Sequence, residues 1–245
     1  MIIDELFPEK GKLVLSANGK EFIERLGVET ARQAVFGVLL GENIRTQTEP
    51  LTRRRVAIVT GAMVYLFAKG WAEFDDFTEK LSIQALEQMI ASGSNNKAVF
   101  WPAMWLVGLT GKSIQNVLRS NSATQENYIS DFENAIEEAS RRCQEDFGPI
   151  SFKLGYFVNG ELKQNIRPLE WKDIARLSTA IGAATLTIRG SEKSTYGKLF
   201  ERLIMGSVLT ILGFQYVKNS KSDILEKVFW LSDNSDDREC DATIR

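Results

Sequence analysis

Two carboxylates near the end of the chain, Glu201 and Asp241, are the residues whose types and positions best suit chemistry. Glu201 lies beside the apolar stripe of a predicted helix, and Asp241 lies in the middle of a predicted strand. Carboxylate oxygens on rigid elements are suitable ligands for a hard cation such as Mg²⁺. A bound Mg²⁺ can activate water and neutralise the charge that develops when a phosphodiester is hydrolysed. We therefore take Glu201 and Asp241 as candidate catalytic and metal-binding residues.

The C-terminal segment around these carboxylates predicts the elements that would hold them. A hydroxyl side chain, Ser194 or Thr195, can cap a helix that Gly213 ends. Apolar residues recur in this helix at the spacings of an amphipathic helix: Leu199, Phe200, Leu203, Ile204, Val208, Ile211 and Leu212. A short strand at 214–217 and an apolar run at 228–231 follow, and a polar turn leads to a last strand of alternating apolar and polar residues. The predicted order is helix, strand and hairpin.

This order, with one acid on the helix and one on the last strand, resembles the beginning of the nuclease core of the PD-(D/E)XK superfamily. The segments YGKLFERLIMGSVLTILGF and FWLSDNSDDRECDATIR are similar to that part of type II restriction endonucleases, in particular the CfrBI group. The resemblance implies that Asp241 is the main metal ligand and that Glu201 assists it from the helix. It further implies Mg²⁺ as the cofactor and double-stranded DNA, cut at a short specific sequence, as the substrate.

One part of the family pattern, a strand expected after Asp241, is missing from this sequence. In that family the next strand carries an acid, any residue and a lysine, which supply a second metal ligand and a catalytic amine. The sequence ends at Arg245, and Glu192-Lys193 and Glu226-Lys227 are adjacent pairs without the intervening residue. We therefore expect these 245 residues to be the front of a longer protein, interrupted inside the core sheet and inactive alone.

Both carboxylates also have structural interpretations. An acid beside the apolar stripe of a helix is most often part of its solvated flank, and this is the ordinary interpretation of Glu201. Asp is disfavoured in the centre of a strand, although a charge there can protect an exposed edge strand from association. Glu239 shares the face of Asp241 in a regular strand, so it is a second candidate ligand, ranked below Asp241.

Composition limits the classes of catalysis that this chain can perform. Of its 245 residues, 44% are hydrophobic and 25% charged, as in ordinary globular proteins. The net charge of -2 excludes a strongly basic nucleic-acid binder but allows a local basic surface. There is no histidine, which excludes histidine-dependent triads and His-ligated zinc. Cys143 and Cys240 lack metal-ligand spacing and indicate reduced thiols in a cytoplasmic protein.

The sequence indicates neither a secretory signal nor a membrane partner. The N-terminus opens with acids and Pro8, whereas a secretory signal begins with basic residues. The most apolar runs, 56–68 and 98–109, are shorter than the roughly 20 residues that a membrane span needs. We interpret both runs as core helices.

The predicted secondary structure of the chain changes near residue 148. Residues 1–148 predict a helical N-terminal domain, in which Thr48-Glu49-Pro50 is expected to break the helices. Asn159-Gly160, between two short runs of strand-forming residues, predicts a hairpin. Residues 149–245 therefore predict this hairpin, two helices separated at Arg189-Gly190-Ser191, and the first strands of an incomplete nuclease-like core. The expected class is α+β, with a mostly helical N-terminal region followed by the start of a restriction-endonuclease-like α/β core.

The preferred function is a Mg²⁺-dependent type II restriction endonuclease whose partner is double-stranded DNA and which can form a homodimer. The alternative is a non-enzymatic, helical DNA-binding or protein-interaction module in which Glu201 and Asp241 are structural. Arg53, Arg54 and Arg55 could contact phosphates, although such clusters are more often solvated ends of helices with weak surface ion pairs. The residues that read DNA bases are not assigned.

Overall fold

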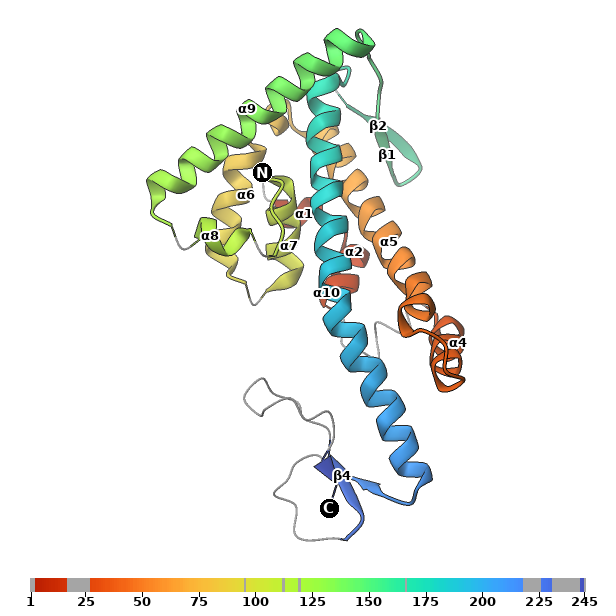
Figure 1. Cartoon of the computed structure of the whole chain (residues 1–245). Helices are drawn as coiled ribbons and strands as arrows, with labels where there is room; N and C mark the ends of the chain where they lie inside the picture. The colour runs from red at the N-terminus through yellow and green to blue at the C-terminus, as the bar shows by residue number, and fades with distance from the viewer. Residues whose placement is uncertain are drawn as a thin grey trace. The chain divides into compact units, whose positions relative to one another are not determined.

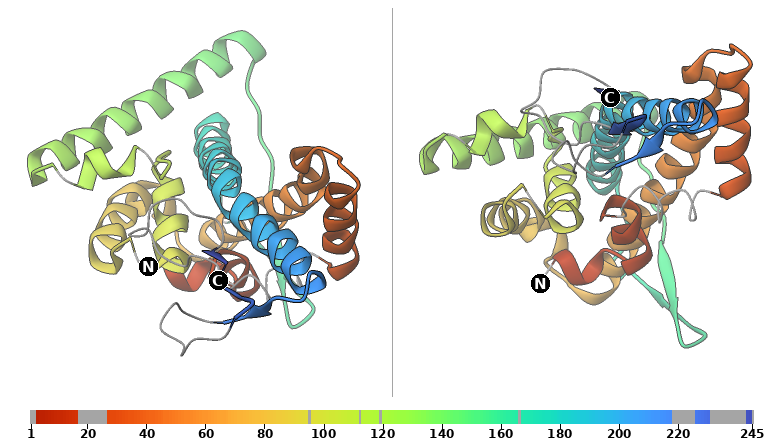
Figure 2. Two further views of the ribbon diagram at one scale, coloured as in Figure 1. Left: turned by 60° about the horizontal axis from the view of Figure 1, so that its bottom comes forward. Right: turned by 90° about the horizontal axis from the view of Figure 1, so that it is seen from below.

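The computed structural model describes residues 3–16, 27–94, 96–111, 113–118, 120–165, 167–217, 226–230 and 243–244. Its helices are α1 (Ile3–Leu6), α2 (Glu9–Ser16), α4 (Val28–Leu39), α5 (Ile44–Glu73), α6 (Phe77–Ser92), α7 (Lys97–Leu106), α8 (Ile114–Leu118), α9 (Ser122–Phe147) and α10 (Trp171–Ile211). Its strands are β1 (Gly155–Val158), β2 (Glu161–Gln164), β3 (Gln215–Tyr216), β4 (Val228–Trp230) and β5 (Thr243–Ile244). The described chain is mostly helical with two small sheets, which confirms the α+β class (Figure 1 and Figure 2).

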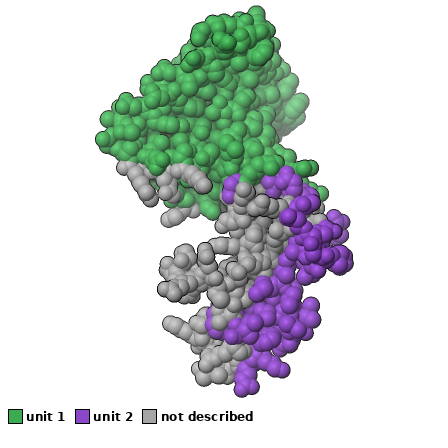
Figure 3. Space-filling view, in the orientation of Figure 1, with its two compact units in different colours: residues 1–18, 53–189 green, residues 19–52, 190–245 purple. Residues whose placement is uncertain are grey.

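The chain divides into two compact units (Figure 3). Unit 1 contains residues 1–18 and 53–189, and unit 2 contains residues 19–52 and 190–245. The predicted domain boundary at residue 148 lies within unit 1. The reason is visible in the contacts after this point: the Trp171 indole donates to the Gly148 carbonyl oxygen at 2.7 Å, and Leu169 and Ala180 belong to the same core as the preceding helices.

The core of unit 1 lies between α5, α6, α7 and the first part of α10. Its members are buried apolar residues of these helices, among them Val59, Met63, Leu66, Leu81, Ala85, Ala103, Met104, Ala180 and Ala184. The rings of Phe67, Trp71 and Phe77 pack with centroid separations of 5.0, 5.7 and 6.1 Å, in geometries typical of aromatic clusters. Trp105 is fully buried, which confirms that the aromatic run of α7 is core.

Helix α5 continues through the break predicted at Thr48-Glu49-Pro50. Pro50 lies inside the helix, although proline removes one helical hydrogen bond and commonly kinks or ends a helix. The break lies earlier, where Gly41 adopts φ 89° and the Glu42 amide donates to the Gly37 carbonyl oxygen at 3.0 Å. This pattern is a glycine C-cap of α4.

Helix α10 is a single helix of 41 residues where two were predicted. Gly190 stays helical, because an isolated glycine costs a helix only about 1 kcal/mol relative to alanine and does not force its end. Gly213 ends α10 as predicted: it adopts φ 88°, and the Phe214 amide donates to the Leu209 carbonyl oxygen at 2.9 Å.

One stretch of α5, Glu49–Glu73, is long and apolar enough to cross a membrane by length and composition. This is weak evidence for a span, because the core helix of a soluble protein meets the same criterion. Val59, Met63, Leu66 and Phe67 of this stretch are fully buried in the core of unit 1. The stretch therefore has the packing of a core helix, as predicted for its apolar run.

The hairpin predicted at Asn159-Gly160 is present in unit 1. Strands β1 and β2 are antiparallel, with Phe157 opposite Leu162 and Val158 opposite Glu161. Asn159 and Gly160 adopt φ values of 51° and 85°, as a two-residue type I′ turn requires. Figure 1 shows the hairpin beside α5.

In unit 2 the end of α10 precedes a three-stranded sheet in the order β3-β4-β5. Strand β3 is parallel to β4, and β5 is antiparallel to β4, with Phe229 opposite Ile244. Helix α10 packs on β4, since a Cβ added at Gly206 would lie 3.9 Å from the Phe229 ring. In the described residues the predicted order of helix, strand and hairpin is confirmed.

Candidate functional site

The described residues contain only part of the predicted site. Glu201 lies in α10, which confirms its position on a helix, but its side chain is not among the described ones. Asp241 and its neighbour Glu239 lie outside the described residues. The expected proximity of the two carboxyl groups of Glu201 and Asp241 therefore stays a prediction.

The structure describes elements on both sides of these positions. Helix α10, which carries Glu201, packs on β4 through Gly206 and Phe229, and the Phe229 side chain is buried. Strand β5, whose Thr243 follows Asp241 closely in sequence, pairs with β4 through Trp230. Hence α10, which carries Glu201, packs on the β3-β4-β5 sheet. The last strand of that sheet, β5, directly follows Asp241 in the sequence.

The donor types of the site fit a hard cation. Glu201 and Asp241 offer carboxylate oxygens, which Mg²⁺ prefers over nitrogen or sulfur ligands. In the part of the chain that the structure describes, no three His, Cys, Asp or Glu side chains come together as a metal site. The assignment of a metal to Glu201 and Asp241 stays a prediction.

The spacing of an acid, any residue and a lysine does occur before the predicted core, at Glu161-Leu162-Lys163 and Glu170-Trp171-Lys172. The first lies on β2 with Glu161 and Lys163 exposed, and the second begins α10, where Lys172 forms an ion pair with Glu137. Both belong to unit 1, outside the β3-β4-β5 sheet, so neither supplies the strand that the family pattern requires after Asp241.

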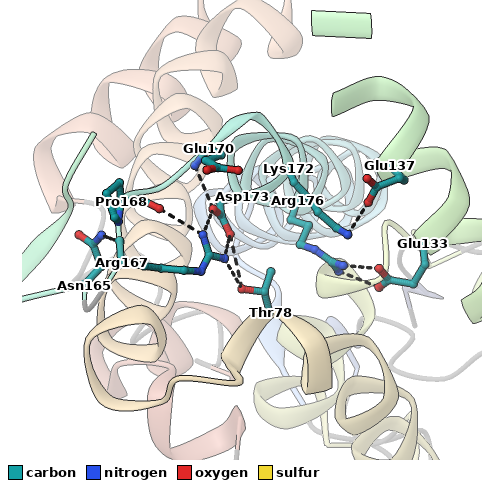
Figure 4. Close-up of polar contacts among 10 residues, drawn as sticks. All are labelled: Thr78, Glu133, Glu137, Asn165, Arg167, Pro168, Glu170, Lys172, Asp173 and Arg176. Carbon is teal, nitrogen blue, oxygen red and sulfur yellow. Dashed lines mark hydrogen bonds and ion pairs between the residues drawn. The ribbon is translucent and has the colours of Figure 1, made fainter. Parts of the chain in front are cut away.

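A second concentration of charged groups lies in unit 1 between α6, α9 and α10 (Figure 4). The Arg176 side chain is 3% exposed. It donates through Nη1 to Glu133 at 2.7 Å and to Ser82 at 3.3 Å, and through Nη2 to the other oxygen of Glu133. Ser82 also donates to Glu133. Arg176 is buried and Glu133 is 31% exposed, and these contacts hold α10 against α6 and α9.

Asp173 organises the neighbouring polar contacts at the start of α10. Its carboxylate accepts two hydrogen bonds from Arg167 at 2.9 Å each, one from Thr78 at 3.4 Å and one from the Glu170 amide at 3.0 Å. The bond to the Glu170 amide is half of a capping box. The hydrogen bond with Asp173 raises the pKa of Arg167, with its charge adding to the effect. Asp173 therefore fixes the beginning of α10.

A cavity of about 260 Å³ opens beside this cluster. Its lining residues are Trp71, Phe74, Asp75, Thr78, Asn165, Arg167 and Leu169. The Arg167 guanidinium faces Asp173 with both terminal nitrogens, and the Asn165 amide donates to the Arg167 carbonyl oxygen. Because Arg167 and Asn165 already bind other groups of the protein, we interpret this cavity as a packing gap between elements of unit 1.

Comparisons of the sequence with known proteins identify a family for this chain. The model of the CfrBI restriction endonuclease family matches residues 28–245. The chain is 31% identical over 247 residues to the type II restriction enzyme CfrBI of Citrobacter freundii, covering 97% of this chain and 63% of that relative. The chain thus spans less than two thirds of the length of the relative. No solved structure matches the chain significantly. By the extent of the family match, this chain belongs to the CfrBI restriction endonuclease family.

Proposed function

We propose that this chain contributes to a type II restriction endonuclease that hydrolyses phosphodiester bonds of double-stranded DNA at a short specific sequence. The observation that carries the proposal is the family match over residues 28–245, which includes both Glu201 and Asp241. The supporting scaffold is α10 packed on β4, with β5 beside it. The absence of histidine from the sequence leaves carboxylates and lysines as the available acid-base groups.

In this proposal Asp241 and Glu201 hold a Mg²⁺ ion between the last strand and α10. When bound, such an ion lowers the pKa of a coordinated water and neutralises charge on the scissile phosphate. The role of the two carboxylates is to fix the ion against rigid elements, and the role of α10 is to fix Glu201. Family membership also supports a soluble, cytoplasmic protein, and a homodimer would present one site to each strand of the duplex.

The test is a cleavage assay on two proteins: the 245-residue chain, and the chain extended by a segment matching the remainder of the relative. Each is incubated with plasmid DNA, with Mg²⁺ or with a chelator. We expect the extended protein to give discrete DNA fragments only with Mg²⁺. Sequencing of the fragment ends then identifies the recognition sequence. We expect no cleavage by the shorter chain, because no acid-x-Lys triplet follows Asp241 in it.

Two results would count against the proposal. Cleavage by the shorter chain that survives Asp241→Asn would place the active site elsewhere. Binding of DNA by the extended protein without cleavage under any divalent cation would instead favour the alternative, a non-enzymatic DNA-binding module. The control for folding is circular dichroism: the Asp241→Asn variant should retain the helical signal of the unmodified shorter chain.

A further inference from the structure

The turn of the β1–β2 hairpin in unit 1 places an asparagine directly before a glycine in an exposed position. Asn159 and Gly160 are both exposed, and they lie between Val158 and Glu161, the last pair of the β1–β2 ladder. Among the turn and loop hydrogen bonds of the described residues, the Gly160 amide donates to no backbone carbonyl oxygen. The nitrogen of Gly160 is therefore held neither by the ladder nor by the turn.

The space around Gly160 is open as well. Nothing lies within 4 Å of the position that a Cβ atom would occupy at this residue. A side chain on the residue after an asparagine hinders the approach of that residue's backbone nitrogen to the asparagine side chain, and glycine has no side chain. The Gly160 nitrogen and the side-chain carbonyl carbon of Asn159 are thus close in the chain, with no group between them.

An asparagine followed by such a nitrogen can undergo an intramolecular substitution, because the two reacting groups are held together by the backbone. The Gly160 nitrogen attacks Cγ of Asn159, a C–N bond forms, and the bond from Cγ to Nδ2 breaks. Ammonia leaves with the proton of the Gly160 amide, and a five-membered succinimide ring remains. Water then opens the ring at one of its two carbonyl carbons. The reaction consumes water, releases ammonia and involves no oxidation or reduction.

We propose that Asn159-Gly160 is a site of spontaneous modification, at which the folded chain converts an asparagine into an aspartyl or isoaspartyl residue through a succinimide. The co-reactant is water. The proposal is independent of the proposed function, since it uses only the turn of the hairpin.

The surroundings of other asparagines explain why this one is singled out. No other asparagine of the described residues precedes a glycine. Asn134 precedes Ala135 inside α9, where the Ala135 amide takes part in the helical hydrogen bonds. Asn165 is 4% exposed, and its side chain accepts from the Leu154 amide at 2.7 Å and donates to the Arg167 carbonyl oxygen.

The two products have different effects on the hairpin. Ring opening at Cγ restores the normal backbone, and Asp-Gly suits a type I′ turn as Asn-Gly does. This product adds a negative charge beside the exposed Glu161. Ring opening at the backbone carbonyl carbon gives the isoaspartyl product, whose main chain is longer by one methylene group. A two-residue turn of that length no longer matches the pairing of Val158 with Glu161.

The change should stay at the turn end of the hairpin, because the next part of β1 is anchored. Tyr156 is 5% exposed, its ring packs at 5.5 Å on the ring of Tyr65 in α5, and its hydroxyl donates to Glu73. These contacts do not involve the turn. We therefore expect the isoaspartyl product to loosen the hairpin beyond Tyr156 without detaching it from α5.

The first experiment incubates the folded 245-residue chain at neutral and at mildly alkaline pH and follows its peptides by mass spectrometry over days. The Asn159 peptide should gain the mass difference between a carboxyl and an amide group, faster at the higher pH because the attacking nitrogen must lose its proton. Conversion should be at least about tenfold faster at Asn159 than at Asn134, since the Ala135 amide must first leave a helical hydrogen bond. Asn18-Gly19, which lies outside the described residues, is a second Asn-Gly pair for comparison.

The second experiment separates the two products by hydrogen exchange. Asn159→Asp carries the charge of the aspartyl product without the added methylene group, so its β1 and β2 peptides should exchange as in the unmodified chain. The isoaspartyl fraction of the incubated chain should exchange faster next to the turn. Both samples should keep the slow exchange of the α5 peptide that contains Tyr65.

Conversion of Asn159 in the folded chain, well ahead of Asn134, would support the proposal. If Asn159 stays unmodified in the folded chain, whatever happens at Asn18, the proposal is wrong. Conversion of Asn159 only after unfolding in urea would show that the turn protects this residue, which also contradicts the proposal. Equal rates at Asn159 and Asn134 would mean that the turn gives the reaction no advantage, and the assignment of the site would fail.

Discussion

The two units differ in how tightly their described residues pack. In unit 1 a Cβ added at Gly70 would lie 2.2 Å from the Phe77 ring, whereas in unit 2 the corresponding atom at Gly206 would have its nearest neighbour at 3.9 Å. At Gly70 unit 1 therefore has no room for a methyl group, whereas at Gly206 unit 2, which carries the predicted chemistry, has room for one.

The units also differ in what their acids do. Glu133 and Asp173 in unit 1 accept hydrogen bonds from arginines and hydroxyls of their own unit. Such acids are committed to structure, and a metal would have to displace their arginine partners to reach them. The position of an acid, more than its type, therefore separates a structural from a catalytic candidate. The following predictions test this contrast.

The largest expected effect is on catalysis in unit 2. In the extended protein, Asp241→Asn or Glu201→Gln should reduce cleavage by about a thousandfold, the size of loss seen when charge stabilisation of a transition state is removed. DNA binding in the absence of Mg²⁺ should stay within about twofold, since neither change removes a cation that binds phosphate. The measurements are single-turnover cleavage and anisotropy. Glu145→Gln, on an exposed acid of α9, is the control and should cut normally.

The sequence predicted those features that depend on local patterns. Asn159-Gly160 predicted a hairpin because both residues tolerate positive φ, and Gly213 predicted the end of α10 for the same reason. The continuity of α10 through Gly190 and of α5 through Pro50 was not predicted, because a breaking residue only shifts a local balance that the surrounding structure can override.

The polar contacts of unit 1 also could not be predicted from the sequence. Glu133 and Arg176 are separated by 43 residues and meet only because α9 and α10 pack together. No spacing rule identifies such a pair. For the candidate site, the helix of Glu201 and the order of strands followed from periodicity, while the assignment of a metal to Glu201 and Asp241 came from the resemblance and stays a prediction.

The second prediction concerns the ion pair of unit 1 between the buried Arg176 and the partly exposed Glu133. Arg176→Met should lower the free energy of unfolding by about 1 to 3 kcal/mol, because Glu133 is then left without its partner. Arg176→Met combined with Glu133→Leu should recover most of this loss. Urea denaturation followed by tryptophan fluorescence measures both. The control Arg142→Gln removes an exposed partner of Asp146 and should cost less than about 1 kcal/mol; an equal cost for Arg176 would mean that Arg176 is not buried in solution.

The third prediction concerns the anchor of the hairpin. Burial, together with the hydrogen bond to Glu73 and its charge, raises the pKa of Tyr156 to about 12 from an ordinary value of 10.0. Since the folded-state pKa is the higher one, this contribution to stability is complete below pH 10 and is lost as the pH rises to about 12. Tyr156→Phe should remove that loss and cost about 1 kcal/mol at neutral pH through the lost hydrogen bond. Denaturation at pH 8 and above pH 10 tests this, and Tyr216→Phe, an exposed tyrosine of β3, should retain the wild-type pH dependence.

The last prediction compares the space around one glycine of each unit, with one substitution in each. Gly70→Ala should destabilise unit 1 by about 1 to 3 kcal/mol, because the added methyl collides with the buried Phe77 ring and the core must shift. Gly206→Ala should stabilise unit 2 by about 1 kcal/mol, because alanine favours the helix and its methyl gains an ordinary contact with Phe229 at 3.9 Å. Hydrogen exchange measured on peptides from α5 and from β4 separates the two units: α5 amides should exchange faster in the first variant, and β4 amides more slowly in the second. If Gly206→Ala accelerated exchange in β4, α10 would have to approach that strand more closely than the described contact allows, and unit 2 would be as tightly packed as unit 1.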